Sequence, residues 1–403
     1  MVHHLRPLRA SCLPVLLSWF SLATLCACTS PTQPKDTAEV DVQTEVDVDV
    51  DKDGGTPAAR VERVDLGVHA TGEDGKTPEI SFDLPQDVTA VVIHAEGDSN
   101  FHFIVAGLTR DQGFALVPKG WLAQTSSPKA CVGPCANRLV AQRGYAAFLF
   151  PNTPLVEMRP GAHQLRIFAF DDENAPAQTK IQVSLDLVRP APKDAILKLP
   201  INLCFTGAQG WTAKNSSEVP RLEAGLARAR ELFGQAGIEL GPVRRFDVDK
   251  QGQYIATQVG ADSDLAKLFQ SAEGLPNGVN VFFTGKVIAT GAPPGANVAL
   301  GVAGGIPGPP NEVGHIRGGV ALSLHIPTGQ SDLLGIALAH EVCHYLGLFH
   351  SSEPGANGAH DTLPDTDDND TTNLLYWSLS EQSVKLSHEQ RQVLRRSPWL
   401  VAP

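Results

Sequence analysis

The chain has 403 residues, of which 42% are hydrophobic and 19% charged, a composition typical of a globular protein rather than a disordered chain. Its length allows two domains, each with its own core. The net charge is −12 at pH 7 and the sequence has no basic stripe, so nucleic acid is excluded as the expected partner.

Residues 1–27 have the pattern of an export signal. Arg6 and Arg9 precede the apolar run Leu13–Leu25, which is too short to cross a bilayer as a stable anchor. The run ends in "LCAC", which resembles the lipobox of bacterial lipoproteins and implies that Cys28 becomes the lipidated first residue. The sequence therefore predicts an exported protein of the cell envelope, held at the outer membrane or cell surface by a lipid anchor. The alternative is a plain signal cleaved after Ala27.

Residues 28–60 are acidic, rich in turn-forming residues and poor in large apolar side chains. Such a segment cannot bury enough apolar surface to offset the entropy lost on ordering, so it is predicted to be a disordered tether. Asp49, Asp51 and Asp53 match the start of a calcium-binding EF-hand loop, but Arg60 occupies the position of its bidentate glutamate. A solvated linker is therefore the expected structure.

Residues 61–190 are predicted to form an all-β accessory domain, an antiparallel sandwich, because short runs rich in Val, Ile and Phe alternate with turn sequences. The expected strands are Glu79–Leu84, Val88–Ala95, Phe101–Gly107, Tyr145–Phe150, His163–Phe170 and Lys180–Val188. Cys131 and Cys135 lie close together in an exported chain, so we expect a local disulfide. The sequence leaves open whether Cys204 and Cys343 pair.

Residues 195–403 follow the linker Arg189–Asp194 and mix helical with strand patterns, which predicts an α/β (α+β) domain. Apolar residues recur at helical spacing from Pro220 to Ala236, and Gly237 is placed to end that helix. The expected strands are the apolar runs Ala195–Phe205, Gly278–Gly285 and Gly318–Ile326.

A second helix is predicted from Asp332 to about Leu346, with Ser331 as its N-cap. His340 and His344 are four residues apart and therefore lie on one face of this helix, where both imidazoles can bind one tetrahedral zinc ion. Glu341 projects beside the metal rather than onto it. From there it could take a proton from a zinc-bound water.

Gly347 permits a left-handed backbone, so the helix can end there and the chain can turn back. His350 would then supply the third nitrogen ligand, which leaves the fourth position open for water, as in catalytic zinc sites. The alternative is a buried helix whose histidines are satisfied by hydrogen bonds. Three histidines at ligand spacing, with a glutamate and a helix stop among them, favour the metal site.

The pattern HExxHxxGxxH in "HEVCHYLGLFH" is that of the metzincin clan of zinc peptidases, and the residues after it are similar to the pappalysin-type members. Those proteins continue with a loop Asp-x-x-x-Asp-Thr, which Asp361, Asp365 and Thr366 match. They close with a helix that opens Thr-x-x-Gln, for which this chain offers Ser387 and Gln390. The resemblance implies a metzincin-like fold and zinc peptidase activity for the second domain.

The resemblance also implies an Asn-x-Met turn beneath the zinc. Asn373 matches it, but Leu375 stands where methionine is expected, and the only methionines of the chain are Met1 and Met158. Leucine is similar to methionine in volume, so a working turn is expected. Trp377 occupies the place of a tyrosine that reaches the zinc in some metzincins, so no tyrosine ligand is assigned.

Two interpretations of polar residues stay open. Asp361 and Asp365 belong to an acidic run that could clamp a structural calcium ion, as the resemblance implies, or could form a solvated loop. If the sandwich is a pro-segment, the thiolate of Cys131 or Cys135 could reach the zinc as an inhibitor, although the neighbouring cysteine favours the disulfide.

These features predict an exported, lipid-anchored zinc endopeptidase that cleaves a protein or peptide substrate, with Glu341 as general base. Gly318–Ile326 is the expected edge of the cleft, where an extended peptide could pair as an added strand. Two alternatives are a surface binding lipoprotein that holds zinc without turnover and a zinc hydrolase of a cell-wall amide bond. The intact Glu341 argues against the first alternative.

Overall fold

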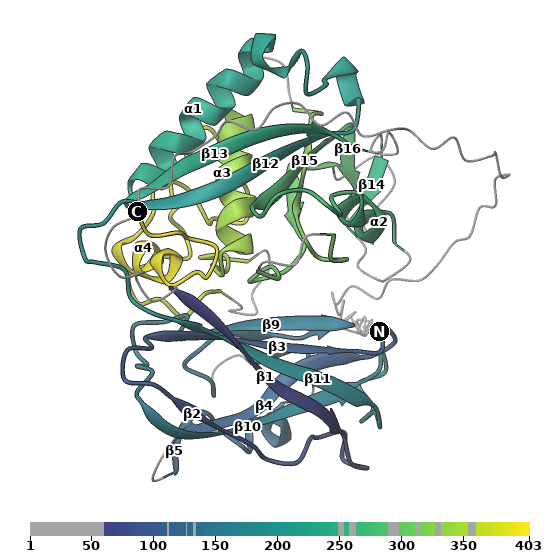
Figure 1. Ribbon diagram of the computed structural model, residues 1–403, viewed down its shortest axis with the longest axis vertical. Coiled ribbons are helices and arrows are strands. Elements are labelled where there is room, and N and C mark those ends of the chain that lie inside the picture. The colour runs from purple at the N-terminus through teal and green to yellow at the C-terminus, as the bar shows by residue number, and fades with distance from the viewer. Residues whose placement is uncertain are drawn as a thin grey trace, which may run out of the picture.

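The computed structural model describes residues 60–110, 113–125, 127–131, 134–248, 254–257, 263–288, 298–310, 314–326, 332–353 and 360–403. The protein is predominantly β-sheet with few helices, a mixed α/β structure (Figure 1). The signal segment with Cys28, the tether up to residue 59 and the expected N-cap Ser331 lie outside the described residues. Within the described ranges, no helix is both long enough and apolar enough to cross a bilayer.

The first half of the described chain forms two antiparallel sheets packed face to face. One sheet has the order β1 (Val61–Ala70), β11 (Lys180–Val188), β3 (Ala90–Gly97), β9 (Tyr145–Phe150). The other has the order β2 (Ile80–Leu84), β10 (Gly161–Phe170), β4 (His102–Arg110), β5 (Phe114–Val117), and β8 (Gln142–Arg143) also pairs with β4. All six predicted strands are confirmed. These segments form strands because their β-branched and aromatic side chains fit a buried sheet face. Fully buried Ile93, Phe103, Phe150 and Ile167 lie in the core between the sheets.

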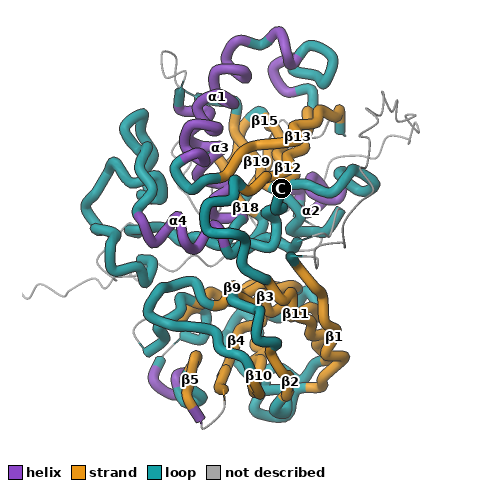
Figure 2. The backbone as a smooth tube through the Cα atoms, turned by 60° about the vertical axis from the view of Figure 1, so that its left-hand side comes forward, coloured by secondary structure: helices purple, strands orange, loops and turns teal. Residues whose placement is uncertain are grey.

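The sheet that contains β9 is buried on both faces. All six residues of β9 are buried. Ala146 and Phe148 face the core of the sandwich, whereas the alternate residues Ala147 and Leu149 join a hydrophobic cluster with the second half of the chain. Successive side chains of a strand point to opposite faces, so β9 serves two cores at once. Figure 2 shows this sheet lying between the other sandwich sheet and the helical part.

The second half is built on a five-stranded sheet with the order β13 (Ile238–Asp247), β12 (Leu197–Phe205), β15 (Val279–Thr284), β19 (Val320–Ser323), β18 (Gly301–Ala303). The first four strands pair in parallel, and β18 is antiparallel to β19. The helices α1 (Pro220–Gly234) and α3 (Leu333–Tyr345) cover one face of the sheet, and α2 (Asp264–Gln270) covers the other (Figure 1).

The remaining elements are short. They are a sheet of β14 (Tyr254–Ala256), β16 (Lys286–Ile288) and β17 (Val298–Ala299), a pair of β6 (Ala130–Cys131) and β7 (Leu139–Val140), 3-10 turns at Trp121–Gln124, Ala208–Gly210 and Ser216–Glu218, and the helix α4 (His388–Arg395).

Two glycines bring α1 and α3 into close contact. A Cβ atom added at Gly335 of α3 would lie only 2.3 Å from the carbonyl oxygen of Gly225 in α1. The two backbones therefore touch at this point, which a side chain at Gly335 would prevent. This contact fixes where α3, the helix with the histidine motif, lies across the sheet.

One prediction about the sheet is wrong. Gly318–Ile326 was expected to form the edge of the cleft, but its strand β19 is paired on both sides, with β15 and with β18. Among the described strands, β18 is the outer strand on this side of the sheet, and it lies in a Gly/Pro-rich segment too irregular in sequence to be assigned to any element. β18 is a strand because it pairs with β19, and its own sequence pattern does not indicate this pairing.

Candidate metal centre

The three predicted ligands come together at the end of α3. His340 and His344 lie one turn apart on the same face of the helix. Gly347 has a φ of 114°, a conformation that glycine adopts readily, and the backbone N–H of Leu348 donates to the carbonyl of Cys343 to close the helix. The chain then turns so that His350 returns to the other two. Candidate ligand atoms of the three histidines all lie within 4.8 Å of one another.

The nitrogen atoms have the spacing that one zinc ion requires. Nε2 of His340 lies 3.1 Å from Nε2 of His344 and 3.2 Å from Nε2 of His350. An ion about 2.0–2.1 Å from each nitrogen at a tetrahedral angle would separate them by about 3.3 Å. Three imidazole lone pairs that point at one another, two of them on buried rings, repel unless a cation lies between them. The donor set therefore fits zinc.

The second nitrogen of each ring is anchored to an acceptor. Nδ1 of His340 lies 2.6 Å from the carbonyl oxygen of Leu374, and Nδ1 of His344 lies 2.7 Å from that of Leu348. Nδ1 of His350 lies 3.1 Å from Oε1 of Glu353. Because these oxygens only accept, each Nδ1 carries the proton and each Nε2 presents its lone pair to the shared point.

Burial keeps the helix histidines neutral. It lowers the pKa of His340 to about 3, with a further lowering from His350. It also places the pKa of His344 well below its usual value, and both neighbouring histidines add to that effect. Imidazoles must be neutral to bind a metal, so these two ligands need not lose a proton near pH 7.

Glu341 lies in the wall of the same site, against the edge strand. Its side chain is only 8% exposed, and its carboxylate accepts a hydrogen bond from the backbone N–H of Ala303 in β18. A Cβ atom at Gly301 would lie 2.5 Å from Cγ of Glu341, so the glycine makes room for the glutamate. Burial raises the pKa of Glu341 to about 8, against the opposing effect of the Ala303 N–H. A cation at the triad would favour the carboxylate form.

The chain makes a turn at Asn373, where the N–H of Tyr376 donates to the carbonyl of Asn373. The side-chain amides of Asn373 and Gln390 hydrogen-bond each other reciprocally at 3.1 Å, and Asn373 Oδ1 also accepts from the N–H of Leu375 at 2.8 Å. Leu375 is completely buried, and its carbonyl accepts from the N–H of Ser351, next to the third histidine. Ser387 caps α4 in a capping box with Gln390. The turn therefore ties α4 to the histidine segment.

The two aspartates proposed for calcium make other contacts. Oδ1 of Asp361 accepts from Thr366 Oγ1 at 2.6 Å and from the N–H of Leu363, and burial raises the pKa of Asp361 to about 6. Both carboxylate oxygens of Asp365 are used at the N-terminus of α4, by Ser387 Oγ and by the N–H of Glu389. Among the described residues, the histidine triad is the one cluster suited to a metal. Calcium at these aspartates stays a prediction without support.

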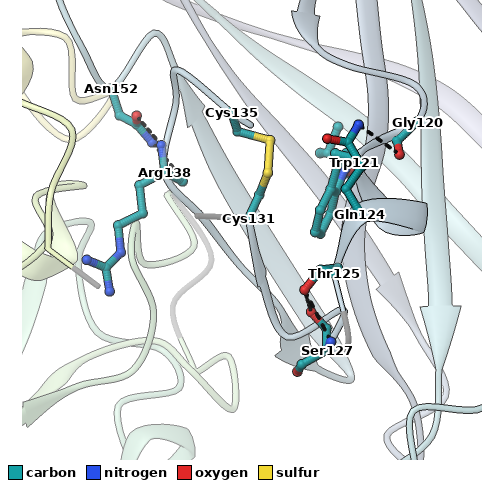
Figure 3. Close-up of a disulfide and its surroundings, with 10 residues drawn as sticks. Gly120, Trp121, Gln124, Thr125, Ser127, Cys131, Cys135, Arg138 and Asn152 are labelled. Atoms are coloured by element: carbon teal, nitrogen blue, oxygen red, sulfur yellow. Dashed lines mark hydrogen bonds between the residues drawn. A yellow bond between two sulfur atoms is a disulfide. The ribbon is translucent and has the colours of Figure 1, made fainter. Parts of the chain in front are cut away.

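None of the four described cysteines belongs to the candidate metal site. Cys131 and Cys135 form a disulfide (Figure 3), so neither supplies the inhibitory thiolate considered above. Cys204 and Cys343 are buried, free and not paired with each other. Burial raises the pKa of both thiols far above the usual value, so they stay protonated.

Several residues of the site could not be identified from the sequence. Glu353 and the carbonyls of Leu348 and Leu374 hold the imidazoles, and Gly301 and Ala303 accommodate Glu341. A backbone carbonyl or N–H can come from any residue type, so only the tertiary structure identifies these partners.

No protein-family model and no curated protein matches the sequence. Among solved structures, metalloproteinase-II from Bacteroides fragilis aligns at 12% identity over 53% of this chain and 62% of that chain, with a TM-score of 0.32. Family two carbohydrate esterases from Clostridium thermocellum and Cellvibrio japonicus align at 11% identity over 55% and 57% of this chain and 62% and 81% of theirs, with TM-scores of 0.15 and 0.13. Likenesses this weak do not identify a fold family, so function has to come from the site itself.

Proposed function

We propose that the protein is a zinc-dependent endopeptidase of the metzincin type, similar to the pappalysin-type members. The observation that carries this proposal is the convergence of three imidazole Nε2 atoms, each with its Nδ1 anchored, beside a buried glutamate. His340, His344 and His350 would hold the zinc. An ion held by three histidines, with a general base next to it, is the arrangement of a hydrolytic rather than a structural zinc site.

Zinc, when bound, supplies a Lewis acid that polarises water and the scissile carbonyl. Glu341 accepts the proton of the attacking water and returns it to the leaving amine. The N–H of Ala303 holds the carboxylate in place, and the walls around it exclude bulk water. Because β18 is the outer described strand next to Glu341, an extended peptide would add to β18 rather than to β19.

Metal content and hydrolysis, measured together on the purified protein, test this function. We expect about one zinc per chain and cleavage of unfolded casein, with loss of cleavage on chelation and recovery when zinc is returned. Zinc binding without cleavage of casein or of peptidoglycan would favour a non-catalytic binding protein. Release of fragments from peptidoglycan but not from casein would identify a cell-wall amide as the substrate.

We further propose that residues 61–190 and 195–403 are separate domains of an exported lipoprotein. In support, one hydrophobic cluster is made entirely of buried residues between Ile80 and Leu187. Limited proteolysis should then cut first between Arg189 and Asp194. Mass spectrometry of the mature N-terminus should find a lipid on Cys28, and an unmodified N-terminus at that cysteine would contradict the anchor.

A further inference from the structure

Arg138 is a buried cation that the proposed chemistry does not use. It belongs to the sandwich, between the Cys131–Cys135 disulfide and β7, and is only 7% exposed. Figure 3 shows its side chain extending away from the disulfide toward the C-terminal half of the chain. Its backbone N–H donates to Oδ1 of Asn152 at 3.0 Å, and its carbonyl accepts from Nδ2 of Asn152 at 2.8 Å. The residue is therefore held firmly on the sandwich side.

The guanidinium of Arg138 ends at the metal centre. Its Nη2 lies 3.4 Å from Oε1 of Glu353, and its Cζ lies 5.0 Å from the centre of the Phe349 ring. The same Oε1 atom is the partner of Nδ1 of His350, at 3.1 Å. One carboxylate oxygen thus connects an arginine of the sandwich with the third candidate ligand.

His350 needs such support more than the other two histidines. His340 and His344 are on a helix and are anchored by backbone carbonyls, whereas His350 lies beyond the helix and is anchored by a side chain. The side chains of His350 and Glu353 are 25% and 30% exposed. Without a second contact, Glu353 would sample several rotamers, and the imidazole that it orients would lose its fixed direction.

The side chain of Arg138 is 8% exposed, so solvent and salt screen its contact with Glu353 less than they screen an ordinary surface pair. Burial lowers the pKa of Arg138, and the carboxylates of Glu353 and Asp361 oppose that lowering. A buried guanidinium holds its partner because leaving either charge unpaired is costly.

We propose that Arg138 is a positioning residue for the metal centre: through Glu353 it orients His350, so that the sandwich sets how tightly the site holds its metal. The inference rests on the metal site of the proposed function but not on hydrolysis.

The test measures zinc affinity of the full-length protein by competition with a chromophoric chelator. Arg138→Met keeps an unbranched apolar side chain in place of the arginine stem and removes the charge. We expect it to weaken zinc binding about 10- to 100-fold, the range found when the partner of a metal-bound histidine is lost. With cobalt in place of zinc, the visible spectrum should also shift, because the orientation of one ligand changes.

Arg60→Met is the matched control. Arg60 also joins the two halves, but it donates to backbone carbonyls of Ser397 and Leu400. We expect this variant to lose stability while its zinc affinity stays within about twofold of the wild type, since substitutions that share no partner with a site act independently of it. Equal zinc affinities for Arg138→Met and Arg60→Met would overturn the proposal.

A double-mutant cycle tests the route through Glu353. If Arg138 acts through this carboxylate, Arg138→Met combined with Glu353→Ala should bind zinc as Glu353→Ala does alone, whereas additive losses would overturn the route. Should Arg138→Met fail to fold, Arg138→Gln, which also removes the charge, replaces it, and unchanged zinc binding in that variant would reject the proposal. Wild-type protein that binds zinc but cleaves nothing defeats the peptidase alone, and wild-type protein that binds no zinc defeats both.

Discussion

At the scale of single residues, the site depends on the hydrogen bond that each histidine makes with the ring nitrogen that does not face the metal position. His340 and His344 use Nδ1 to hold backbone carbonyls, which leaves both Nε2 atoms free for a shared ion. The sequence identified these residue types and their spacing, but not the carbonyls, because any residue can supply a carbonyl. The same holds for the N–H of Ala303 at Glu341.

Replacing Glu341 with Gln should abolish peptide cleavage and leave the metal in place. Glutamine has the same size and can still occupy the space beside Gly301, but it cannot accept a proton, so we expect the turnover rate to fall by about 10²-fold or more. Zinc content by atomic absorption and casein cleavage are measured on the same sample. A variant with normal cleavage would show that another group is the base.

Replacing Gly301 with Ala should displace the side chain of Glu341 without changing its chemistry. The added Cβ would lie 2.5 Å from Cγ of Glu341, so the glutamate has to move. We expect cleavage to fall about tenfold or more with zinc affinity nearly unchanged. Gly234→Ala is the control, since a Cβ there meets no atom within 4 Å. Equal activities in the two variants would mean that Glu341 does not need its present position.

At the scale of elements, local pattern predicted many of the strands and helices, missed others such as β1, β13 and α2, and did not indicate which strands lie at the edge. The six predicted strands of the sandwich and α1 are where apolar periodicity places them. The edge strand β18 has three residues and lies in a Gly/Pro-rich segment, so it is defined only by its pairing with β19. Pairing is a contact between distant segments, and periodicity carries no information about it.

The end of α3 is the element whose geometry the metal centre needs most. Gly347 has a φ of 114°, and a Cβ there would lie 2.7 Å from Cδ2 of Leu149 in the sandwich. Gly347→Ala should therefore suffer both backbone strain and a clash, for a loss of about 2 kcal/mol or more in the free energy of unfolding. Because His350 follows this turn, zinc affinity should fall as well.

Gly67→Ala separates the effect of backbone strain from the effect of the clash with Leu149. Gly67 also has a positive φ, of 85°, but a Cβ there meets nothing within 4 Å. We expect about 1 kcal/mol of destabilisation by urea unfolding and no change in zinc affinity. If Gly347→Ala behaved the same way, the contact with Leu149 would not matter to the metal centre.

At the scale of the whole molecule, the sandwich and the C-terminal half share a buried boundary. The sheet that faces this boundary contains a polar network in which Asp186 accepts from Arg63 at 2.8 Å and from His94 at 2.9 Å, while the other nitrogen of His94 lies 2.6 Å from the hydroxyl of Tyr145. Arg63 also donates to the carbonyl of Pro310 in the C-terminal half. These bonds give the buried side chains of Asp186 and His94 hydrogen-bond partners.

This network predicts how stability depends on pH. Burial alone would raise the pKa of Asp186, but the hydrogen bonds from His94 and Arg63 outweigh it, and the pKa is lowered. A carboxyl group with a lowered pKa in the folded state stabilises the fold above its unfolded pKa of about 3.9, and this contribution is lost as pH falls through the folded value. Asp186→Asn should therefore cost about 3 kcal/mol near pH 7, and the difference from the wild type should shrink below about pH 4.

Thermal unfolding between pH 3 and pH 7 measures this difference. Asp87→Asn is the control, because Asp87 is 56% exposed and its pair with Arg189 lies at the surface. We expect that variant to stay within about 0.5 kcal/mol of the wild type at every pH. A constant gap between Asp186→Asn and the wild type down to pH 3 would show that the charge of Asp186 does not stabilise the fold.

The sequence by itself determined the local part of this protein. The spacing of His340, Glu341, His344, Gly347 and His350 predicts a candidate zinc site because helix geometry and the freedom of glycine act over a few residues. Only the tertiary structure decided that β18 is the edge strand, that β9 is buried on both faces and that Arg138 reaches Glu353. Those contacts join segments far apart in the chain, and they depend on how whole surfaces pack rather than on any pattern within one segment.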